Sequence, residues 1–135
     1  MNVVLCIENR GGMLFNHRRL SQDRAVRAHI LKDAAGQKLW MNAYSAGQFT
    51  EEERAHISLA EDFLERAESG DFCFVEDQDI TPYAAKIERI ILYLWNRDYP
   101  SDMQFTFDLS EWHCIAREDF SGYSHEKLTR EVFER

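Results

Sequence analysis

The stretch Arg89–Trp95, RIILYLW, decides the fold, because its six consecutive apolar residues form the longest apolar run in the chain and predict a β-strand. The segment Asn2–Glu8, NVVLCIE, is also continuously apolar, with several β-branched residues, in place of an alternating pattern. Such continuity is typical of a strand buried on both faces in the middle of a sheet. A membrane-spanning helix needs about 18–20 apolar residues, so we expect no membrane segment.

Weaker patterns on either side predict the other strands and the helices. Further strands are expected at Lys38–Ala43, Phe72–Val75, Met103–Phe107, Trp112–Ala116 and Leu128–Phe133. Helices are expected over Gln22–Asp33 with Ser21 as N-cap, after the N-cap Thr50, from the N-cap Ser58 to Gly70, and from Thr81 and Pro82. This order predicts a single three-layer α/β domain over residues 1–135, with a mixed, mostly parallel sheet and antiparallel C-terminal strands.

The composition fits one folded domain, with 135 residues of which 44% are hydrophobic and 30% charged. The net charge is −8, although residues 1–40 carry seven Lys and Arg against three Asp and Glu. Nucleic acids need clustered positive charge, so we expect no general nucleic-acid binding. No secretory signal pattern is found at the N-terminus, which predicts a cytoplasmic protein. Cys6, Cys73 and Cys114 form no Cys-x-x-Cys pair and are expected to be buried free thiols.

The basic N-terminal third is the most ligand-like part of the sequence. Asn9–Gly12 interrupts the first strand, and a loop is expected from there to His17. If Gly11 and Gly12 expose their backbone N–H groups, they form an anion pocket with nearby cations at the C-terminal end of that strand. The side chains assigned to this pocket are His17, Arg18, Arg19, Arg24 and Arg27. Two alternatives stay open. In one, Arg18 and Arg19 are exposed loop charges while Arg24 and Arg27 pair with nearby acids. In the other, His17 with Arg18 or Arg19 cleaves a phosphodiester by acid–base catalysis.

Several phrases in the C-terminal third resemble the dihydrofolate reductase family. They are Arg89–Leu94 (RIILYL), Leu109–Trp112 (LSEW), Glu118–Phe120 (EDF) and Thr129–Arg135 (TREVFER). The first strand, the Arg10–Gly12 turn and the Ser21–Asp23 helix start are similar in order to the family's substrate-loop region. The resemblance implies that family's fold and, by position, makes Asp23 the acid that assists protonation of a pterin. From the sequence, a carboxylate enclosed by apolar groups suits that role, whereas an acid at a helix start also favours the helix dipole.

The cofactor signature of that family is missing. Where the family has a glycine pair that holds the NADPH diphosphate, this chain has Glu76 and Asp77, whose charges repel a diphosphate. Where the family has Gly-Arg before Thr, this chain has Asn42–Ser45, and Ser45 alone is a tolerable match. We therefore expect a domain that has lost NADPH and its activity, and that binds a small anionic ligand or a protein partner. A pterin reductase that uses NADPH, and a nuclease or RNA-phosphate site at residues 16–27, are the alternatives.

Metal chemistry has little support in the sequence. The five histidines are widely separated and no His-x-His occurs, so we expect no zinc hydrolase site and no metal ligands. Glu76, Asp77 and Asp79 supply oxygen ligands of the kind that hard cations prefer, but such a cluster more often caps the following helix, which is the interpretation that we adopt.

Overall fold

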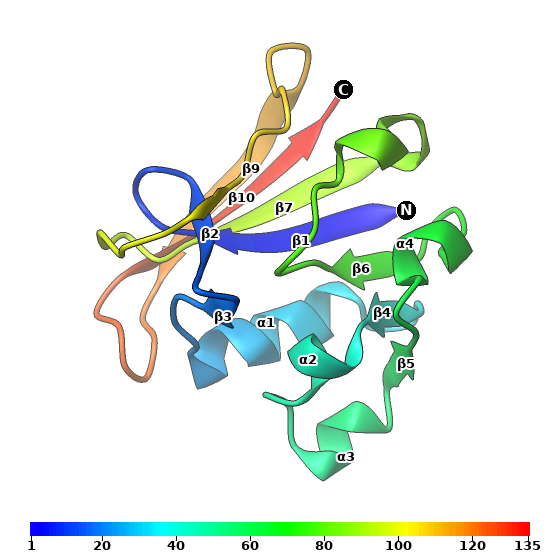
Figure 1. Cartoon of the computed structure of the whole chain (residues 1–135), viewed down its shortest axis with the longest axis horizontal. Helices are drawn as coiled ribbons and strands as arrows, with labels where there is room; N and C mark the ends of the chain where they lie inside the picture. The colour runs from blue at the N-terminus through cyan, green and yellow to red at the C-terminus, as the bar shows by residue number, and fades with distance from the viewer.

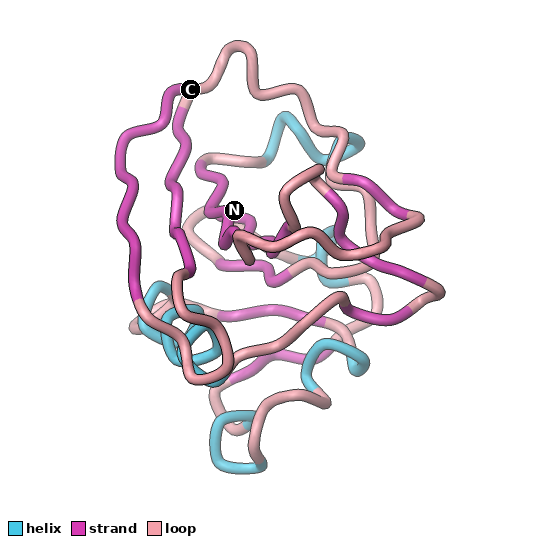
Figure 2. The backbone as a smooth tube through the Cα atoms, turned by 90° about the vertical axis from the view of Figure 1, so that its left-hand side faces the viewer, coloured by secondary structure: helices cyan, strands magenta, loops and turns pink.

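The computed structural model describes all 135 residues and contains a seven-stranded and a three-stranded sheet (Figure 1). Across the larger sheet the strands are β5 (Ile57–Leu59), β4 (Leu39–Met41), β6 (Phe72–Phe74), β1 (Asn2–Ile7), β7 (Arg89–Leu94), β10 (Leu128–Glu134) and β9 (His113–Phe120). The first five are parallel, whereas β10 and β9 are antiparallel. Figure 2 shows β9 and β10 running side by side at one edge. The predicted α/β class, with its mixed sheet, is confirmed.

The two apolar runs form the centre of the sheet. β1 pairs with β7 along its whole length, from Asn2 opposite Arg89 to Ile7 opposite Leu94. Val3, Val4 and Leu5 are fully buried, because both faces of the strand are covered. The continuous apolar pattern therefore predicted their position correctly.

The helices are few and short. They are α1 (Arg24–Asp33), α2 (Ala43–Ala46), α3 (Glu51–Arg54) and α4 (Phe63–Arg66), with a 3-10 helix η1 (Thr81–Lys86). α1 packs Val26 and Ile30 onto one face of the sheet. α4 packs Phe63 and Leu64 onto the other face, which gives the expected three layers.

Hydrogen bonds and an ion pair tie α1 to the sheet. The Tyr93 hydroxyl donates to Asp33 Oδ2 at 2.5 Å, and Arg130 on β10 donates to Asp33 Oδ1 at 2.8 Å. Burial, and the neighbouring Asp33 charge, raise the pKa of Tyr93 well above its usual range. These bonds hold the C-terminal end of α1 against β7 and β10.

The smaller sheet was not expected, since residues 13 to 17 were assigned to a loop. It consists of β3 (Arg18–Arg19), β2 (Gly12–Phe15) and β8 (Met103–Gln104), all antiparallel. Asn16 and His17 form the two-residue connection between β2 and β3, with φ of 53° and 62°. A two-residue hairpin of type I′ needs positive φ at both positions, which asparagine tolerates better than most residues. His17 therefore lies at a hairpin tip.

Several predicted boundaries are wrong. Ser58 lies in β5 and caps no helix, because the helical pattern of Phe63 and Leu64 begins only at α4. The strand expected at Met103–Phe107 is paired only at its first two residues. The strand expected at Trp112–Ala116 is β9, which extends to Phe120. Thr50 is an N-cap as expected, with a full capping box to Glu53.

The cysteines are free, but not all are buried. Cys73 is buried and Cys6 partly buried, whereas Cys114 is exposed on β9, contrary to expectation. Burial raises the pKa of Cys73 to about 12 and that of Cys6 well above its ordinary value. Both therefore stay as unreactive thiols at neutral pH. No helix has the length and apolar character that a membrane crossing requires.

Candidate functional site

Asp23 begins α1 as its N-cap, a role that the sequence pattern assigned to Ser21. Its backbone is extended, and its carboxylate accepts the Ala25 N–H at 2.8 Å. The side chain is fully buried, although an N-cap carboxylate is usually exposed. A buried carboxylate must be surrounded by donors, and those donors come from the far end of the chain.

The loop between β9 and β10 supplies these donors and lies beside the start of α1 (Figure 1). Asp23 Oδ1 accepts the Tyr123 N–H at 3.1 Å, while Oδ2 accepts the Ser124 N–H at 2.9 Å and the Ser124 hydroxyl at 3.0 Å. Gly122 makes this approach possible, because a Cβ there would lie 2.6 Å from Asp23 Oδ2. Polar donors therefore surround the Asp23 carboxylate, so the condition set for a proton relay, enclosure by apolar groups, is not met.

His125, in the same loop, also contacts Asp23. Its Nδ1 lies 2.9 Å from Asp23 Oδ2, and because an ionised carboxylate can only accept, Nδ1 carries the proton. Burial raises the pKa of Asp23, but the hydrogen bonds from His125, Ser124 and Tyr123 outweigh it and hold the pKa well below the ordinary value. Asp23 is thus a permanent carboxylate, which makes it a poor proton donor.

The second ring nitrogen of His125 points to a serine. Nε2 lies 2.9 Å from Ser21 Oγ and 3.3 Å from the Tyr99 hydroxyl, while the ring stacks on Trp95 at 4.9 Å between centroids. We call Ser21, Asp23, Tyr99, Ser124 and His125 the Asp23 cluster. Sequence reasoning missed all of these except Asp23, because His125 is 102 residues away and no local spacing marks it.

Gly11 and Gly12 do not offer free backbone N–H groups. The buried Glu8 carboxylate accepts the Gly12 N–H at 2.6 Å and the Arg10 N–H at 2.8 Å, while the Gly11 N–H donates to the Glu8 carbonyl at 2.9 Å. A Cβ on Gly12 would lie 2.9 Å from Glu8 Oε2. The close approach is thus made at Gly12 alone, and the anion that approaches is Glu8 of the chain itself.

Arg19 is also occupied. Its guanidinium donates to both oxygens of Glu76, at 3.0 Å from Nε and 3.2 Å from NH2, and lies over the Tyr44 ring at 4.4 Å. Burial alone would lower the pKa of Arg19. The hydrogen bond and the charge of Glu76 outweigh this effect, so the pKa lies above its ordinary value. Glu76 is 8% exposed and also accepts from Gln48. The charges of Arg19 and Glu76 therefore neutralise each other within the protein.

Asp77 and Ser45 lie beside this pair, at the carboxyl ends of the parallel strands β4 and β6. Asp77 accepts from the Asn42 amide at 3.1 Å, and Asn42 caps α2 by accepting the Ser45 N–H. The Ser45 hydroxyl is buried without a hydrogen-bond partner. We call Arg19, Asn42, Tyr44, Gln48, Glu76 and Asp77 the Glu76 cluster. Above it is a cavity of about 680 Å³ lined by His17, Tyr44, Asp77 and Asp102, among others.

The remaining arginines of the predicted pocket point elsewhere. Arg24 lies 5.0 Å from the Tyr123 ring centroid, and Arg27 donates to the Gln22 side chain at 3.1 Å. Arg18 is exposed and makes no ion pair, side-chain hydrogen bond or ring contact. With Asn16, Leu20 and Tyr99, it lines a cavity of about 310 Å³. The five side chains are therefore not gathered in one pocket: His17 lines a different cavity, and Arg18 is the one arginine of the set without a partner.

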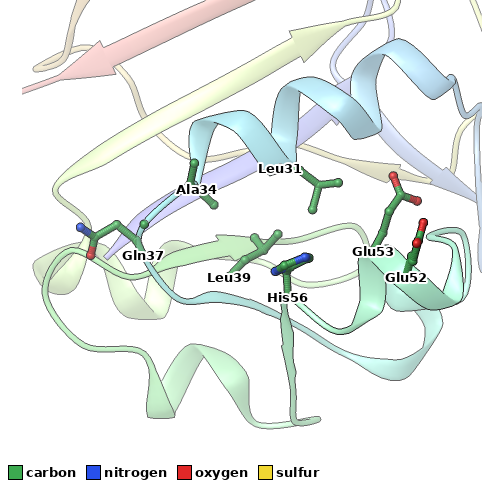
Figure 3. A pocket seen from close by; sticks show the side chains of 9 residues that line it. Leu31, Ala34, Gln37, Leu39, Glu52, Glu53 and His56 are labelled. Carbon is green, nitrogen blue, oxygen red and sulfur yellow. The ribbon is translucent and has the colours of Figure 1, made fainter.

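A further cavity of about 650 Å³ lies between the C-terminal end of α1 and α3. Figure 3 shows the carboxylates of Glu52 and Glu53 at one end of it, Gln37 at the other, and Leu31 and His56 between them. Two carboxylates make this cavity unsuitable for an anion.

No group of three or more His, Cys, Asp or Glu side chains is placed to hold a metal ion. The acids considered for a cation are divided among different partners, since Glu76 bonds Arg19, Asp77 bonds Asn42 and Asp79 bonds Thr81. Asp79 accepts the Thr81 N–H at the start of η1, in keeping with a capping role.

The chain has the dihydrofolate reductase-like fold. It is similar to the solved structure of dihydrofolate reductase from Enterococcus faecalis in complex with NADP(H) and RAB-propyl, with a TM-score of 0.70 over 99% of this chain and 95% of that chain. The two sequences are 9% identical, so the likeness establishes the fold and no activity. Neither a protein-family model nor a curated protein matches the sequence.

Proposed function

We propose that this dihydrofolate reductase-like domain does not bind NADPH and instead binds a small anion, a phosphate or a carboxylate, at Arg18. The observation that carries the proposal is the ion pair of Arg19 and Glu76 at the carboxyl ends of β4 and β6. The pair removes one cation from ligand binding and puts a carboxylate where a diphosphate would need backbone N–H groups.

The charges near the Arg19–Glu76 pair also disfavour binding of NADPH. The cavity above the Glu76 cluster has Asp77 and Asp102 in its wall, and His17 is the one basic side chain in its lining. A diphosphate there would face two carboxylates, whose negative charges repel it. The residues present therefore do not fit the cofactor that the fold suggests.

The reductase alternative also lacks its acid. Asp23 is fully enclosed by five donors, and its lowered pKa keeps it ionised at neutral pH. A group that assists protonation of a substrate needs a proton to give near the working pH, which requires a raised pKa. In this structure Asp23 binds the β9–β10 loop and is not available to a pterin.

Arg18 supports the anion half of the proposal. It is the one arginine of the chain without an ion pair, hydrogen bond or ring contact from its side chain, and it borders a cavity of about 310 Å³. The Asn16 side chain, in the same lining, adds an amide donor, and a guanidinium binds phosphate or carboxylate through two parallel hydrogen bonds.

A titration with inorganic phosphate, followed by the NMR shifts of the backbone amides, tests the proposal. We expect saturable shifts at Phe15–Leu20, lost in Arg18→Ala. Arg10→Ala is the matched control, because Arg10 is equally exposed and belongs to a different turn. Shifts that persist in Arg18→Ala, or that are equally reduced in Arg10→Ala, would show that no specific anion site exists at Arg18.

A further inference from the structure

The Asp23 cluster has the geometry of a serine acyl-transfer site. Ser21 Oγ lies 2.9 Å from His125 Nε2, and His125 Nδ1 lies 2.9 Å from Asp23 Oδ2. A hydroxyl, an imidazole and a carboxylate in this order allow the imidazole to take the hydroxyl proton while the carboxylate fixes the tautomer. We propose that Ser21, His125 and Asp23 hydrolyse an ester that carries a phosphate or carboxylate group.

The tautomer needed for this reaction is set by the surroundings of His125. Asp23 can only accept, so Nδ1 carries the proton and Nε2 is left with a free electron pair toward Ser21. Stacking on Trp95 and the Ser124 contact to Nδ1 at 3.1 Å hold the ring in place. The Tyr99 hydroxyl, 3.3 Å from Nε2, is a second and longer-range donor to the same nitrogen.

Ser21 is accessible, whereas the other two groups are protected. Asp23 and His125 are buried, while Ser21 is half-buried in the segment that leads from β3 to α1. Its neighbour Leu20, and Tyr99 of the cluster, line the 310 Å³ cavity at Arg18. The N–H of Gln22, the residue after Ser21, donates no hydrogen bond within the protein and is therefore available to a developing oxyanion.

The reaction balances with water as the second substrate. Ser21 Oγ bonds to the ester carbonyl carbon as its proton passes to His125 Nε2. The carbon–oxygen bond to the alcohol then breaks, its electron pair stays on the alcohol oxygen, and that oxygen takes the proton from His125. Water attacks the acyl-Ser21 in the same way, so the carboxylic acid leaves and Ser21 recovers its proton, without oxidation or reduction.

The substrate class follows from the position of Arg18. Because Arg18 is the free cation of the adjoining cavity, an ester with an anionic group can place that group at Arg18 and its carbonyl near Ser21. This choice of substrate rests on the proposed anion site, whereas the reactivity of Ser21 does not.

A neutral sulfonyl fluoride, phenylmethylsulfonyl fluoride, tests the reactive serine without using Arg18. We expect one adduct per chain by intact mass, mapped to Ser21 by peptide mass spectrometry. The adduct is lost in Ser21→Ala and retained in Ser110→Ala, a matched control at an exposed serine. His125→Gln, which cannot act as a base, should slow labelling at least about 100-fold.

Asp23 is a positioning residue in this scheme, since it acts through His125. Asp23→Asn is expected to lower kcat for hydrolysis of 4-nitrophenyl acetate while KM stays unchanged, because the ester contacts Ser21 and not Asp23. An unchanged kcat would remove Asp23 from the scheme.

Ser21→Ala should keep the fold, because Ser21 makes one side-chain hydrogen bond in a half-buried loop. If His125→Gln does not fold, loss of the adduct in Ser21→Ala still tests the reactive serine. No adduct on Ser21, or labelling as fast in a folded His125→Gln as in the wild type, would overturn the proposal. Because the reagent is neutral, failure of phosphate binding at Arg18 would leave the adduct unchanged, so the two proposals fail separately.

Discussion

The Asp23 cluster and the Glu76 cluster each contain a buried carboxylate, and they differ in what compensates its charge. Glu76 is paired with the guanidinium of Arg19, and each charge compensates the other. Asp23 is surrounded by neutral donors and by an imidazole whose second nitrogen points to a half-buried hydroxyl. The difference shows two ways of stabilising a buried carboxylate: Glu76 is neutralised by a cation of the same chain, whereas Asp23 is held by neutral donors and by an imidazole that also contacts the half-buried Ser21.

The largest expected effect is the loss of the Asp23 carboxylate. Asp23→Ala leaves the N–H groups of Ala25, Tyr123 and Ser124 without their acceptor, and should lower the free energy of unfolding by about 3–5 kcal/mol. Urea unfolding at pH 7 measures it. Asp98→Ala is the exposed control, with an expected change below about 1 kcal/mol. A change as small in Asp23→Ala would mean that the carboxylate does not hold the β9–β10 loop.

The same carboxylate predicts a pH dependence. The pKa of Asp23 is lower in the folded than in the unfolded protein, so its contribution is fully present above about pH 4 and is lost as the pH falls from there toward the folded-state pKa. Glu88, whose pKa the N-terminal ammonium and Gly70 lower to about 2, adds the same sign of slope. Asp23→Asn keeps Glu88, so the stability of wild type should fall more steeply than that of Asp23→Asn between pH 5 and 3. Equal slopes would contradict this assignment.

Glu76→Gln breaks the ion pair of the other cluster. Arg19, whose side chain is 19% exposed, keeps a charge without its partner, and the free energy of unfolding should fall by about 1.5–3 kcal/mol. Because Arg19 also lines the cavity at Arg18, phosphate binding should become tighter. Calorimetric titration with phosphate measures this, and weaker binding in a folded Glu76→Gln would show that Arg19 does not reach the cavity.

Gly122→Ala tests the close approach in the Asp23 cluster. The new Cβ would lie 2.6 Å from Asp23 Oδ2 and 2.8 Å from Leu128, so the loop must shift, at a cost of about 1–3 kcal/mol. Gly47→Ala is the comparison, since the nearest atom there is 3.3 Å away and φ is −60°. Thermal unfolding of the two variants should separate them; equal midpoints would mean that the loop adapts freely.

The smallest effect is expected for Tyr44→Phe in the Glu76 cluster. The change removes the hydroxyl that accepts the Arg19 N–H at 2.8 Å but keeps the ring beneath the guanidinium. We expect a loss of about 0.5–1 kcal/mol in urea unfolding, with Ser110→Ala as a surface control. A larger loss would indicate that the hydroxyl does more than accept this one bond.

The centre of the sheet could be predicted from the sequence, whereas its periphery could not. The continuous apolar residues of Asn2–Ile7 and Arg89–Leu94 have one stable position, buried between two layers. β3, β5 and β8 are two or three residues long and depend on neighbouring strands, so no periodicity marks them. The resemblance carried by the C-terminal phrases led to the right fold.

The candidate site was only partly predictable. Asp23 and Glu76 were identified because a helix start and a strand end are visible in the sequence. The partners His125 and Arg19 were not assigned, since hydrogen bonds between residues 102 and 57 positions apart leave no local pattern. Gly11 and Gly12 were predicted to bind an anion through their N–H groups, and the sequence does not reveal that Glu8 accepts the Gly12 N–H.

Titration of the protein with NADPH, followed by thermal unfolding, tests the central claim most directly. A ligand at 100 times its Kd stabilises the native state by about 2.7 kcal/mol, which shifts the unfolding midpoint by several degrees in a domain of this size. We predict no shift at millimolar NADPH in wild type, because on the proposed function the carboxylates of Glu76 and Asp77 repel the diphosphate. A saturable rise in the midpoint would contradict the proposed loss of NADPH binding and would favour the alternative function, a pterin reductase that uses NADPH.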